Sequence, residues 1–402
     1  MSIESVVASG LCMQCGTCAG ICPQEAVTMN WTLRGGTLPS VDARRCTKCG
    51  ACREVCPAAG LDLSPHAWWR DPATPNTQDF LGPWRQLYFG WANDPAVRQA
   101  GASGGLATAL LHGAFTEGII DAAICTHLQP HRPLVAEPLV TRTTQEVSDC
   151  RGSKYTMVAV NTALRTAADQ PGRYALVGLP CHMQGLRLAQ RRSPLLRQRI
   201  VLALGIFCGW SCLPQATAVA ARRAGMDPGA LTSLTYRGPG WPGGMDLVGR
   251  DGTRRFLPYP DYFDRFTNAY TPPRCTLCPD ALAELADVSV GDAWLERFAD
   301  SAGVSDVIVR TERGQRLVER VAPAHLCLTE ALPQEILDSQ RETFRLKRSV
   351  FRGRLWLRQL ARRPVPVYPG LATRASAAER MRALADVGSE AFLRLVANVH
   401  YR

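Results

Sequence analysis

Short apolar runs alternate with segments of helical periodicity through the middle of the chain. Residues 118–125, 174–180 and 200–207 are each rich in Ile, Leu, Val and Ala, with helical stretches between them. The longest apolar run, residues 200–210, is too short to span a bilayer, so we interpret it as a buried strand. Strands that alternate with helices predict a layered α/β domain.

Three other segments depart from this alternation. Residues 231–260 contain short apolar runs around a Gly/Pro-rich turn, which predicts a hairpin and an α+β arrangement later in the domain. Residues 26–41 hold Gly35-Gly36 between two β-type runs, which predicts another hairpin. Residues 61–84 are rich in Pro, Asp and Trp, a composition typical of a linker lying over the next domain.

The positive charge of the chain is concentrated near its C-terminus, in residues 341–363. Apolar residues recur through this stretch at roughly helical spacing: Phe344, Leu346, Val350, Leu355, Leu357 and Leu360. This pattern predicts a packed helix with a basic face in solvent rather than a nucleic-acid-binding arm. An acidic partner protein or an anionic cofactor is the next option.

The number and spacing of the cysteines indicate the cell compartment in which the protein works. The chain has 402 residues, a net charge of +11 and 16 Cys. Its first residues, MSIESVVASG, show neither the basic nor the apolar region of a signal peptide. Cysteines bunched at metal-binding spacing therefore predict a reducing, cytoplasmic location.

Two cysteine runs near the N-terminus carry the most specific chemistry. Both have the spacing C-x2-C-x2-C-x3-C-P of a two-cluster bacterial-type ferredoxin, in which three close thiolates bind one [4Fe-4S] cluster and the fourth binds the other. This crossed pattern assigns the first cluster to Cys12, Cys15, Cys18 and Cys56, and the second to Cys46, Cys49, Cys52 and Cys22. A zinc module usually pairs two ligands with two, which fits tandem four-cysteine runs poorly.

Four further cysteines lie far apart in the sequence. Cys181 and Cys208 follow two of the predicted strands, and Cys275 and Cys278 form a C-x-x-C pair in a Pro-rich loop. Strand ends and the loops after them commonly carry ligands, so these four thiolates are candidates for a third cluster. The residues alone leave open two buried free thiols and a separate zinc or redox pair.

Two polar loops are candidate cofactor sites. Residues 101–105, Gly-Ala-Ser-Gly-Gly, precede a predicted helix, and a glycine-rich helix N-terminus suits phosphate oxygens. The full G-x-G-x-x-G fingerprint is missing, and an ordinary tight turn is the alternative. Residues 151–155, Arg-Gly-Ser-Lys-Tyr, offer a cation, a hydroxyl and an aromatic face to a phosphate or a flavin ring, although an exposed loop can have the same composition.

Taken in order, these motifs resemble the family of coenzyme F420 hydrogenase/dehydrogenase beta subunits with a fused two-cluster ferredoxin. The resemblance covers residues 1–300 and beyond. Its marks are Ser103-Gly104-Gly105, Gly152-Ser153-Lys154-Tyr155, Gly178-Leu179-Pro180-Cys181, Gly205-Ile206-Phe207-Cys208, Cys275-x-x-Cys278-Pro279-Asp280 and Ala286-Asp287-Val288-Ser289-Val290-Gly291-Asp292.

The resemblance implies a flavoprotein that binds FAD and one [4Fe-4S] cluster besides the ferredoxin pair, so three clusters in all. Cys181, Cys208, Cys275 and Cys278 become the ligands of the third cluster, with Cys212 as a substitute for Cys208. The implied FAD contacts are Ser103, Gly104, Gly105, Gly152, Ser153, Lys154 and Tyr155. Lys154, our candidate catalytic residue, and Arg237 would meet anionic groups of FAD or coenzyme F420.

The family further implies that the chain oxidises reduced coenzyme F420 through FAD and passes single electrons to a redox partner, which is a hydrogenase, dehydrogenase, reductase or ferredoxin. The alternative within the family is a ferredoxin-dependent reductase of a chlorophyll-pathway tetrapyrrole. A third hypothesis is an electron-transfer subunit without flavin. We expect no nucleic-acid partner and no transmembrane segment, and the sequence leaves a homo-oligomer open.

These inferences divide the chain into four parts. We expect a ferredoxin-like two-cluster domain in residues 1–60, a linker in residues 61–84, a layered α/β and α+β flavoprotein domain in residues 85–340, and a basic helical tail in residues 341–402.

Overall fold

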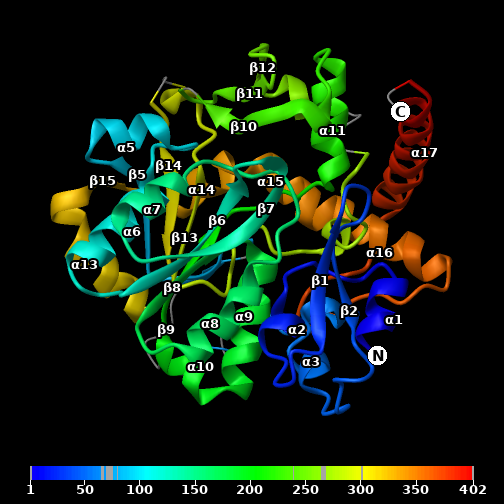
Figure 1. Ribbon diagram of the computed structural model, residues 1–402, viewed down its shortest axis with the longest axis horizontal. Helices are drawn as coiled ribbons and strands as arrows, with labels where there is room; N and C mark the ends of the chain where they lie inside the picture. The colour runs from blue at the N-terminus through cyan, green and yellow to red at the C-terminus, as the bar shows by residue number, and fades with distance from the viewer. Residues whose placement is uncertain are drawn as a thin grey trace.

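The computed structural model describes residues 2–64, 68, 76–78, 80–238, 240–263, 269–299 and 302–400. An eight-stranded mixed sheet forms the centre of the molecule (Figure 1). Its strands, in spatial order, are β15 (Leu326–Glu330), β5 (Gln86–Ala92), β14 (Ser305–Val309), β13 (Val288–Asp292), β9 (Ile200–Ile206), β8 (Tyr174–Gly178), β6 (Ala122–Gln129) and β7 (Arg132–Thr141). The four strands β13, β9, β8 and β6 run parallel, and the other neighbours run antiparallel.

Helices cover both faces of the sheet, because its parallel strands are apolar on both sides. One face carries α6 (Leu106–Thr116) and α13 (Glu312–His325), which bury Leu110 and Leu317 against the strands. The other face carries α8 (Leu164–Asp169), α9 (Pro180–Arg192) and α10 (Pro194–Arg199), which bury Leu164, Leu186 and Leu196. This is the layered α/β core that the alternation of strands and helices predicts.

Local sequence signals set where several helices begin. Asp94 accepts hydrogen bonds from the first amides of α5 (Pro95–Ala100). Thr143 and Glu146 form a capping box at α7 (Thr144–Asp149). Proline occupies the first turn of α9, α10 and α11 (Pro214–Arg223), where a missing amide costs nothing.

A second, smaller sheet lies beside α11, at the top of Figure 1. It consists of β10 (Leu231–Gly238), β11 (Gly244–Gly249) and β12 (Arg254–Pro258), all antiparallel. The hairpin predicted for residues 231–260 is therefore part of a three-stranded sheet. Short 3-10 turns at Pro228–Ala230 and Asp261–Phe263 flank it.

The N-terminal module packs directly on the large domain, as the blue segment in Figure 1 shows. Its elements are α1 (Ile3–Ala8), α2 (Thr17–Gly20), β1 (Val27–Thr32), β2 (Gly36–Val41), α3 (Ala51–Glu54) and a 3-10 turn at Pro57–Ala59. Strands β1 and β2 form the hairpin predicted between the two cysteine runs. Leu11, Val55 and Ala58 belong to the same apolar cluster as α9 and the sheet.

Asn161 is the polar centre of this docking surface. It lies in the 3-10 turn η2 (Val160–Ala163) and is fully buried. Its backbone amide donates to the Cys15 carbonyl at 2.9 Å, and its Nδ2 donates to Thr17 Oγ1 and to the His182 carbonyl, each at 2.9 Å. Gly20 permits this approach, because a Cβ there would lie 2.1 Å from the Asn161 carbonyl oxygen.

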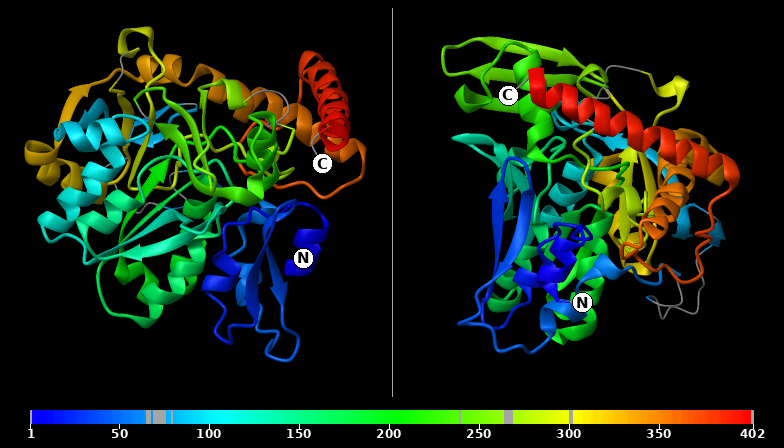
Figure 2. Two further views of the ribbon diagram at one scale, coloured as in Figure 1. Left: turned by 45° about the horizontal axis from the view of Figure 1, so that its top comes forward. Right: turned by 90° about the vertical axis from the view of Figure 1, so that its right-hand side faces the viewer.

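The C-terminal region is helical, as predicted. It comprises α14 (Pro333–Ser339), α15 (Arg341–Phe344), a π-helical turn η7 (Arg345–Val350), α16 (Phe351–Leu360) and α17 (Ala377–His400), which packs along α16 as the long red helix in Figure 2. Its basic face is not simply solvated, because Lys347 is only 3% exposed and Arg348 is paired with Glu284. None of the helices in the described part of the chain has the length and apolar character that a bilayer crossing requires.

The predicted linker, residues 61–84, is described at residues 61–64, 68, 76–78 and 80–84. Its described parts include Trp68, over which the Arg191 guanidinium stacks at 3.6 Å, and the strands β3 (Asn76–Gln78) and β4 (Gly82–Trp84). The contact between Trp68 and Arg191 ties this segment to α9.

Substituting Gly20 by Ala should undock the N-terminal module. The added methyl group overlaps a backbone oxygen that cannot rotate away, so we expect a loss of roughly 1–3 kcal/mol of stability. A lower melting temperature of the intact holoprotein and faster proteolysis between the module and the large domain would measure it. Gly388→Ala is the matched control, since a Cβ at Gly388 meets nothing within 4 Å; equal behaviour of the two variants would contradict the docking role.

Candidate functional site

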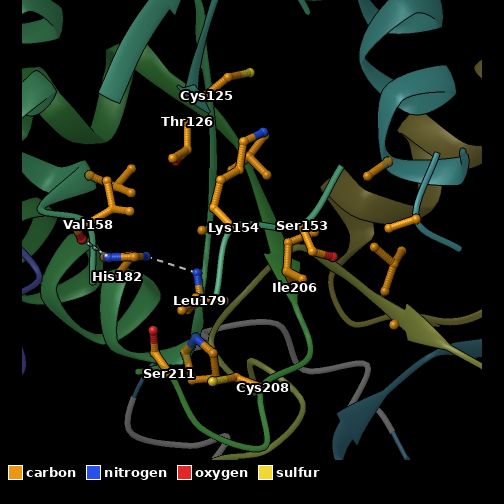
Figure 3. A pocket seen from close by; sticks show the side chains of 18 of the residues that line it. Cys125, Thr126, Ser153, Lys154, Val158, Leu179, His182, Ile206, Cys208 and Ser211 are labelled. Atoms are coloured by element: carbon orange, nitrogen blue, oxygen red, sulfur yellow. Dashed lines mark hydrogen bonds between the residues drawn. The ribbon is translucent and has the colours of Figure 1, made fainter. Parts of the chain in front are cut away.

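A cavity of about 270 Å³ opens where the carboxyl ends of the parallel strands meet. The segments that follow β8 and β9, together with the end of β13, form part of its wall. Ligands bind at this edge of parallel sheets because loops of variable sequence converge there on a rigid frame. In Figure 3, Cys125 and Thr126 lie at one end of the cavity and Cys208 and Ser211 at the other, with Ser153 and Lys154 between them.

The four cysteines predicted to bind a third cluster all line this cavity. Cys181 lies in the first turn of α9, Cys208 follows β9, and Cys275 and Cys278 flank the 3-10 turn Cys275–Leu277. Burial raises the pKa of Cys208 to about 12 and that of Cys181 well above its ordinary value. Cys212 is buried but does not belong to the cavity wall, so the geometry favours Cys208 over its proposed substitute.

Two cations are buried against these thiols. Burial alone would lower the pKa of Lys347, but Cys278, Cys208 and Cys275 raise it above its ordinary value. Arg274 is 1% exposed and donates to the Leu277 carbonyl at 2.6 Å. A buried positive charge is costly unless negative charge lies nearby, which thiolates or a bound anionic cluster would supply.

Two buried hydroxyls on the cavity wall lack a protein partner. Ser211 Oγ, near Cys208, and Thr156 Oγ1 have no hydrogen-bond partner among the described residues. Buried hydroxyls in native proteins are usually satisfied. Their position indicates a polar ligand in the cavity and fits the donor set expected around a flavin and a cluster.

His182, next to Cys181, is held neutral and fixed. The Leu179 amide donates to its Nδ1 at 2.9 Å, and its Nε2 lies 2.9 Å from the Val158 carbonyl, as the dashed lines in Figure 3 show. Burial lowers the pKa of His182 to about 4. The imidazole therefore positions the start of α9 without adding charge to the cysteine end.

The glycine-rich turn predicted at residues 101–105 opens onto the cavity at the N-terminus of α6. Gly101, Ser103 and Gly105 line the wall, whereas Gly104 does not. Gly105 has φ +67°, and a Cβ there would lie 2.3 Å from the Val97 carbonyl oxygen, so only glycine fits. The turn thus presents backbone amides and a helix N-terminus to the cavity, the geometry that suits a phosphate.

The second predicted loop contributes Gly152, Ser153 and Lys154 to the cavity wall. The Lys154 ammonium donates to three carbonyls of its own loop, those of Cys150, Arg151 and Gly152. Burial lowers the pKa of Lys154 to about 8. Lys154 therefore holds the loop closed through these three bonds.

Arg237 and Tyr155, which we predicted as cofactor contacts, are not among the residues that line the cavity. Arg237 forms an ion pair with Asp292 at 2.8 Å and donates to Tyr155 Oη at 3.2 Å and to the Ala102 carbonyl at 3.0 Å. Asp292 thus balances the charge of Arg237. Arg237 instead ties the glycine-rich turn, the second loop and β13 together.

Four of the ferredoxin cysteines form one group, and three members of the other set, Cys22, Cys46 and Cys52, lie near one another. Cys12, Cys15, Cys18 and Cys56 line one small cavity of about 20 Å³. Burial and then the nearby Cys22 and Cys46 raise the pKa of Cys52. The sequence-distant Cys56 thus joins the first three cysteines, as crossed ligation requires.

The first of these groups lies beside the large cavity. Burial is the main reason why the pKa of the Cys181 thiol is raised. The next largest cause is Cys15, which therefore lies close to Cys181. Arg274 Nη2 also donates to the Pro57 carbonyl at 3.4 Å, next to Cys56, and to Tyr368 Oη at 2.6 Å. One buried cation therefore bridges the ferredoxin module and the cysteine end of the cavity.

Comparison with protein families now identifies the chain. Residues 87–165 and 172–335 match the N-terminal and C-terminal parts, respectively, of "Coenzyme F420 hydrogenase/dehydrogenase, beta subunit", and residues 11–59 match "4Fe-4S dicluster domain". The chain belongs to the family of coenzyme F420 hydrogenase/dehydrogenase beta subunits. The resemblance inferred from its ordered motifs is confirmed, and so is the mixed α/β fold with a ferredoxin-like module.

Several known proteins of this kind are similar to the chain. Coenzyme F420 hydrogenase subunit beta of Methanothermobacter thermautotrophicus is 28% identical over 63% of the chain and 87% of the relative. One subunit of the F(420)H(2) dehydrogenase of Methanosarcina mazei is 25% identical over 79% of the chain and 84% of the relative. A protein in the F420-reducing [NiFe] hydrogenase complex of Methanosarcina barkeri shares the fold, with TM-score 0.55 and 22% identity over 68% of this chain and 94% of that one.

Sequence reasoning missed Lys347, Arg274, Ser211 and the pair Cys125 and Cys150. Each of them lines the cavity through tertiary packing rather than through a local motif. Lys347 lies in a run of basic residues that predicts a solvated face. The one signal for its burial is its position three residues after the apolar Phe344, on the same side of a helix.

Two serine variants of the ferredoxin cysteines should each damage a different cluster. Cys56→Ser should damage the cluster of Cys12, Cys15 and Cys18, and Cys22→Ser should damage the cluster of Cys46, Cys49 and Cys52, because the fourth ligand crosses over. Resolved EPR spectra of the reduced proteins would tell which cluster is altered. Damage to the cluster nearest in sequence in either variant would overturn the crossed assignment.

Proposed function

We propose that this protein oxidises reduced coenzyme F420 through a bound FAD and passes electrons singly along three [4Fe-4S] clusters to a partner. The observation that carries the proposal is the cavity that joins a phosphate-type helix N-terminus to four buried cysteines. Bound there, a flavin would accept two electrons as a hydride and release them one at a time to iron–sulfur clusters.

The residues that would hold FAD come from two loops. Ser103 and Gly105, at the N-terminus of α6, would receive its phosphates, and Gly152, Ser153 and Lys154 would line the remaining wall. Arg237 positions both loops from behind through its bonds to Ala102 and Tyr155. We assign Lys154 to closure of the loop rather than to proton transfer, since its ammonium contacts three carbonyls.

The residues that would hold the third cluster are Cys181, Cys208, Cys275 and Cys278. Their thiols must lose protons as metal binds, and the buried Lys347 would compensate the negative charge that results. The ferredoxin ligands are assigned as two crossed sets, Cys12, Cys15, Cys18 and Cys56 on the one hand and Cys46, Cys49, Cys52 and Cys22 on the other.

The proximity of Cys15 to Cys181 supports an order for the electron path. The cluster of Cys12, Cys15, Cys18 and Cys56 would receive electrons from the cavity, and the second ferredoxin cluster would pass them on. Cys49 of that second set is exposed, so a partner would dock at this edge. The names of the relatives, subunits of a hydrogenase and a dehydrogenase, support a partner subunit of that kind.

Rapid reduction of the flavin by reduced coenzyme F420 is the expected result in anaerobic stopped-flow experiments. NADH and NADPH should be much slower, because the chain lacks the full dinucleotide fingerprint. Electrons should then appear on the clusters and pass to a viologen dye. A flavin that stays oxidised in reduced coenzyme F420 would refute the proposal, and so would reduction of a chlorophyllide-type substrate by reduced ferredoxin.

Substituting Lys347 by Met should lower the reduction potential of the third cluster. The reduced cluster carries one more negative charge, which a buried ammonium stabilises by roughly 1–2 kcal/mol, equivalent to about 40–90 mV for one electron. Redox titration followed by EPR would measure the shift.

Lys347→Arg should retain most of the potential because it keeps the charge. Arg345→Met is the matched control, since the Arg345 side chain is 44% exposed and pairs with Glu342. An unchanged potential in Lys347→Met, with all clusters present, would contradict the role of Lys347.

A further inference from the structure

Two thiols outside every cluster motif meet at the wall of the cavity. Cys125 lies on β6 and is 4% exposed, and Cys150 ends α7 and is partly exposed. They are 25 positions apart in sequence, but α7 packs against β6, and the two thiols lie close enough that each shifts the pKa of the other. Both are free thiols, and both line the cavity.

The surroundings of the two thiols are unequal. The pKa of Cys150 is lowered, first by the hydrogen bond from Cys125 and then by the Lys154 ammonium. These effects outweigh burial and the carboxylates of Asp149 and Glu146, which raise the pKa. The hydrogen bond to Cys150 and then burial raise the pKa of Cys125, whose Sγ also lies 3.9 Å from Thr141 Oγ1. Cys150 is therefore the more nucleophilic thiol, and Cys125 is placed to resolve a disulfide formed on it.

We propose that Cys125 and Cys150 form a redox-active dithiol that small disulfides, such as oxidised glutathione, convert into an intramolecular disulfide. Cys150, as thiolate, attacks one sulfur of the small disulfide and releases one thiolate. Cys125 then loses its proton to that thiolate, attacks Sγ of Cys150 and expels the second small thiolate, which takes a proton from solvent to replace the one that Cys150 gave up on forming its thiolate. Two protein thiols are oxidised and one small disulfide is reduced to two thiols, and no step requires FAD or a cluster.

The position of the pair gives the disulfide a structural consequence. Cys150 begins the loop that brings Gly152, Ser153 and Lys154 to the cavity, and Lys154 donates to the Cys150 carbonyl. A bond from Cys150 to Cys125 would anchor this loop to β6. The oxidation state of the pair thus controls how freely one wall of the cavity moves.

Disulfide mapping on the holoprotein tests the proposal. The anaerobic protein is equilibrated in glutathione buffers of increasing oxidised fraction, quenched with acid, blocked with N-ethylmaleimide and digested with trypsin without reduction. Trypsin cuts after Arg142, between the two cysteines, so their disulfide appears as a cross-linked peptide pair in mass spectra. Iron content is measured in each sample to verify that the cluster ligands stay bound.

We expect the cross-linked pair to dominate the oxidised samples. Cys125→Ser should instead trap glutathione on Cys150, about tenfold more than in the wild type, because the resolving thiol is missing. Cys150→Ser should leave Cys125 mostly labelled by N-ethylmaleimide. Cys327→Ser is the matched control and should leave the cross-link unchanged, since Cys327 lies on β15 and contacts Asn93.

The wild-type digest alone can overturn the proposal, whatever the stability of the variants. If Cys125 and Cys150 stay separately labelled in a buffer that has already oxidised Cys327, the pair is not redox-active. Separate glutathione adducts on the two cysteines, without the cross-link, would overturn it as well.

Discussion

The close docking of the ferredoxin module on the sheet is the constraint on which the rest of the structure depends. Asn161 supports it, because its backbone amide donates to the Cys15 carbonyl while its side-chain amide donates to Thr17 and to the His182 carbonyl. A buried polar group that lost these partners would cost about 1–3 kcal/mol. Apolar residues of the module share one core with α9, so the first cysteine group lies next to the cavity instead of on a separate lobe.

Buried positive charge follows from that docking. Arg274 bridges the module, the Cys275–Leu277 turn and the C-terminal segment at Tyr368. Lys347 reaches the same region from the π-helical turn of the C-terminal helices, a local widening frequent at functional sites. Two distant parts of the chain therefore supply the positive charge that the proposed anionic clusters would need, and the C-terminal region contributes to the cavity wall.

Local patterns in the sequence predict the ferredoxin motifs, the strands and the glycine-rich turn, because each of them is set by spacing within a few residues. The four cysteines of the large domain also stand out in the sequence, since two follow predicted strands and two share a C-x-x-C pair. The sequence could not predict that Asp292 neutralises Arg237, or that Lys154 binds its own loop carbonyls. Both facts depend on tertiary contacts or loop closure, which residue types alone do not encode.

The two ends of the cavity differ in how firmly they are held. At the cysteine end, Cys181 and Cys208 lie on the first turn of α9 and directly after β9, so the sheet fixes them. At the other end, residues 150–154 form a loop whose contacts are the three bonds of Lys154, the backbone bonds to the end of α7 and the approach of Cys150 to Cys125. The proposed electron transfer between cofactors would need rigid spacing, which the cysteine end provides through the sheet. The proposed exchange of a coenzyme would need a wall that can open, and the loop end, closed by side-chain contacts, is where we place it.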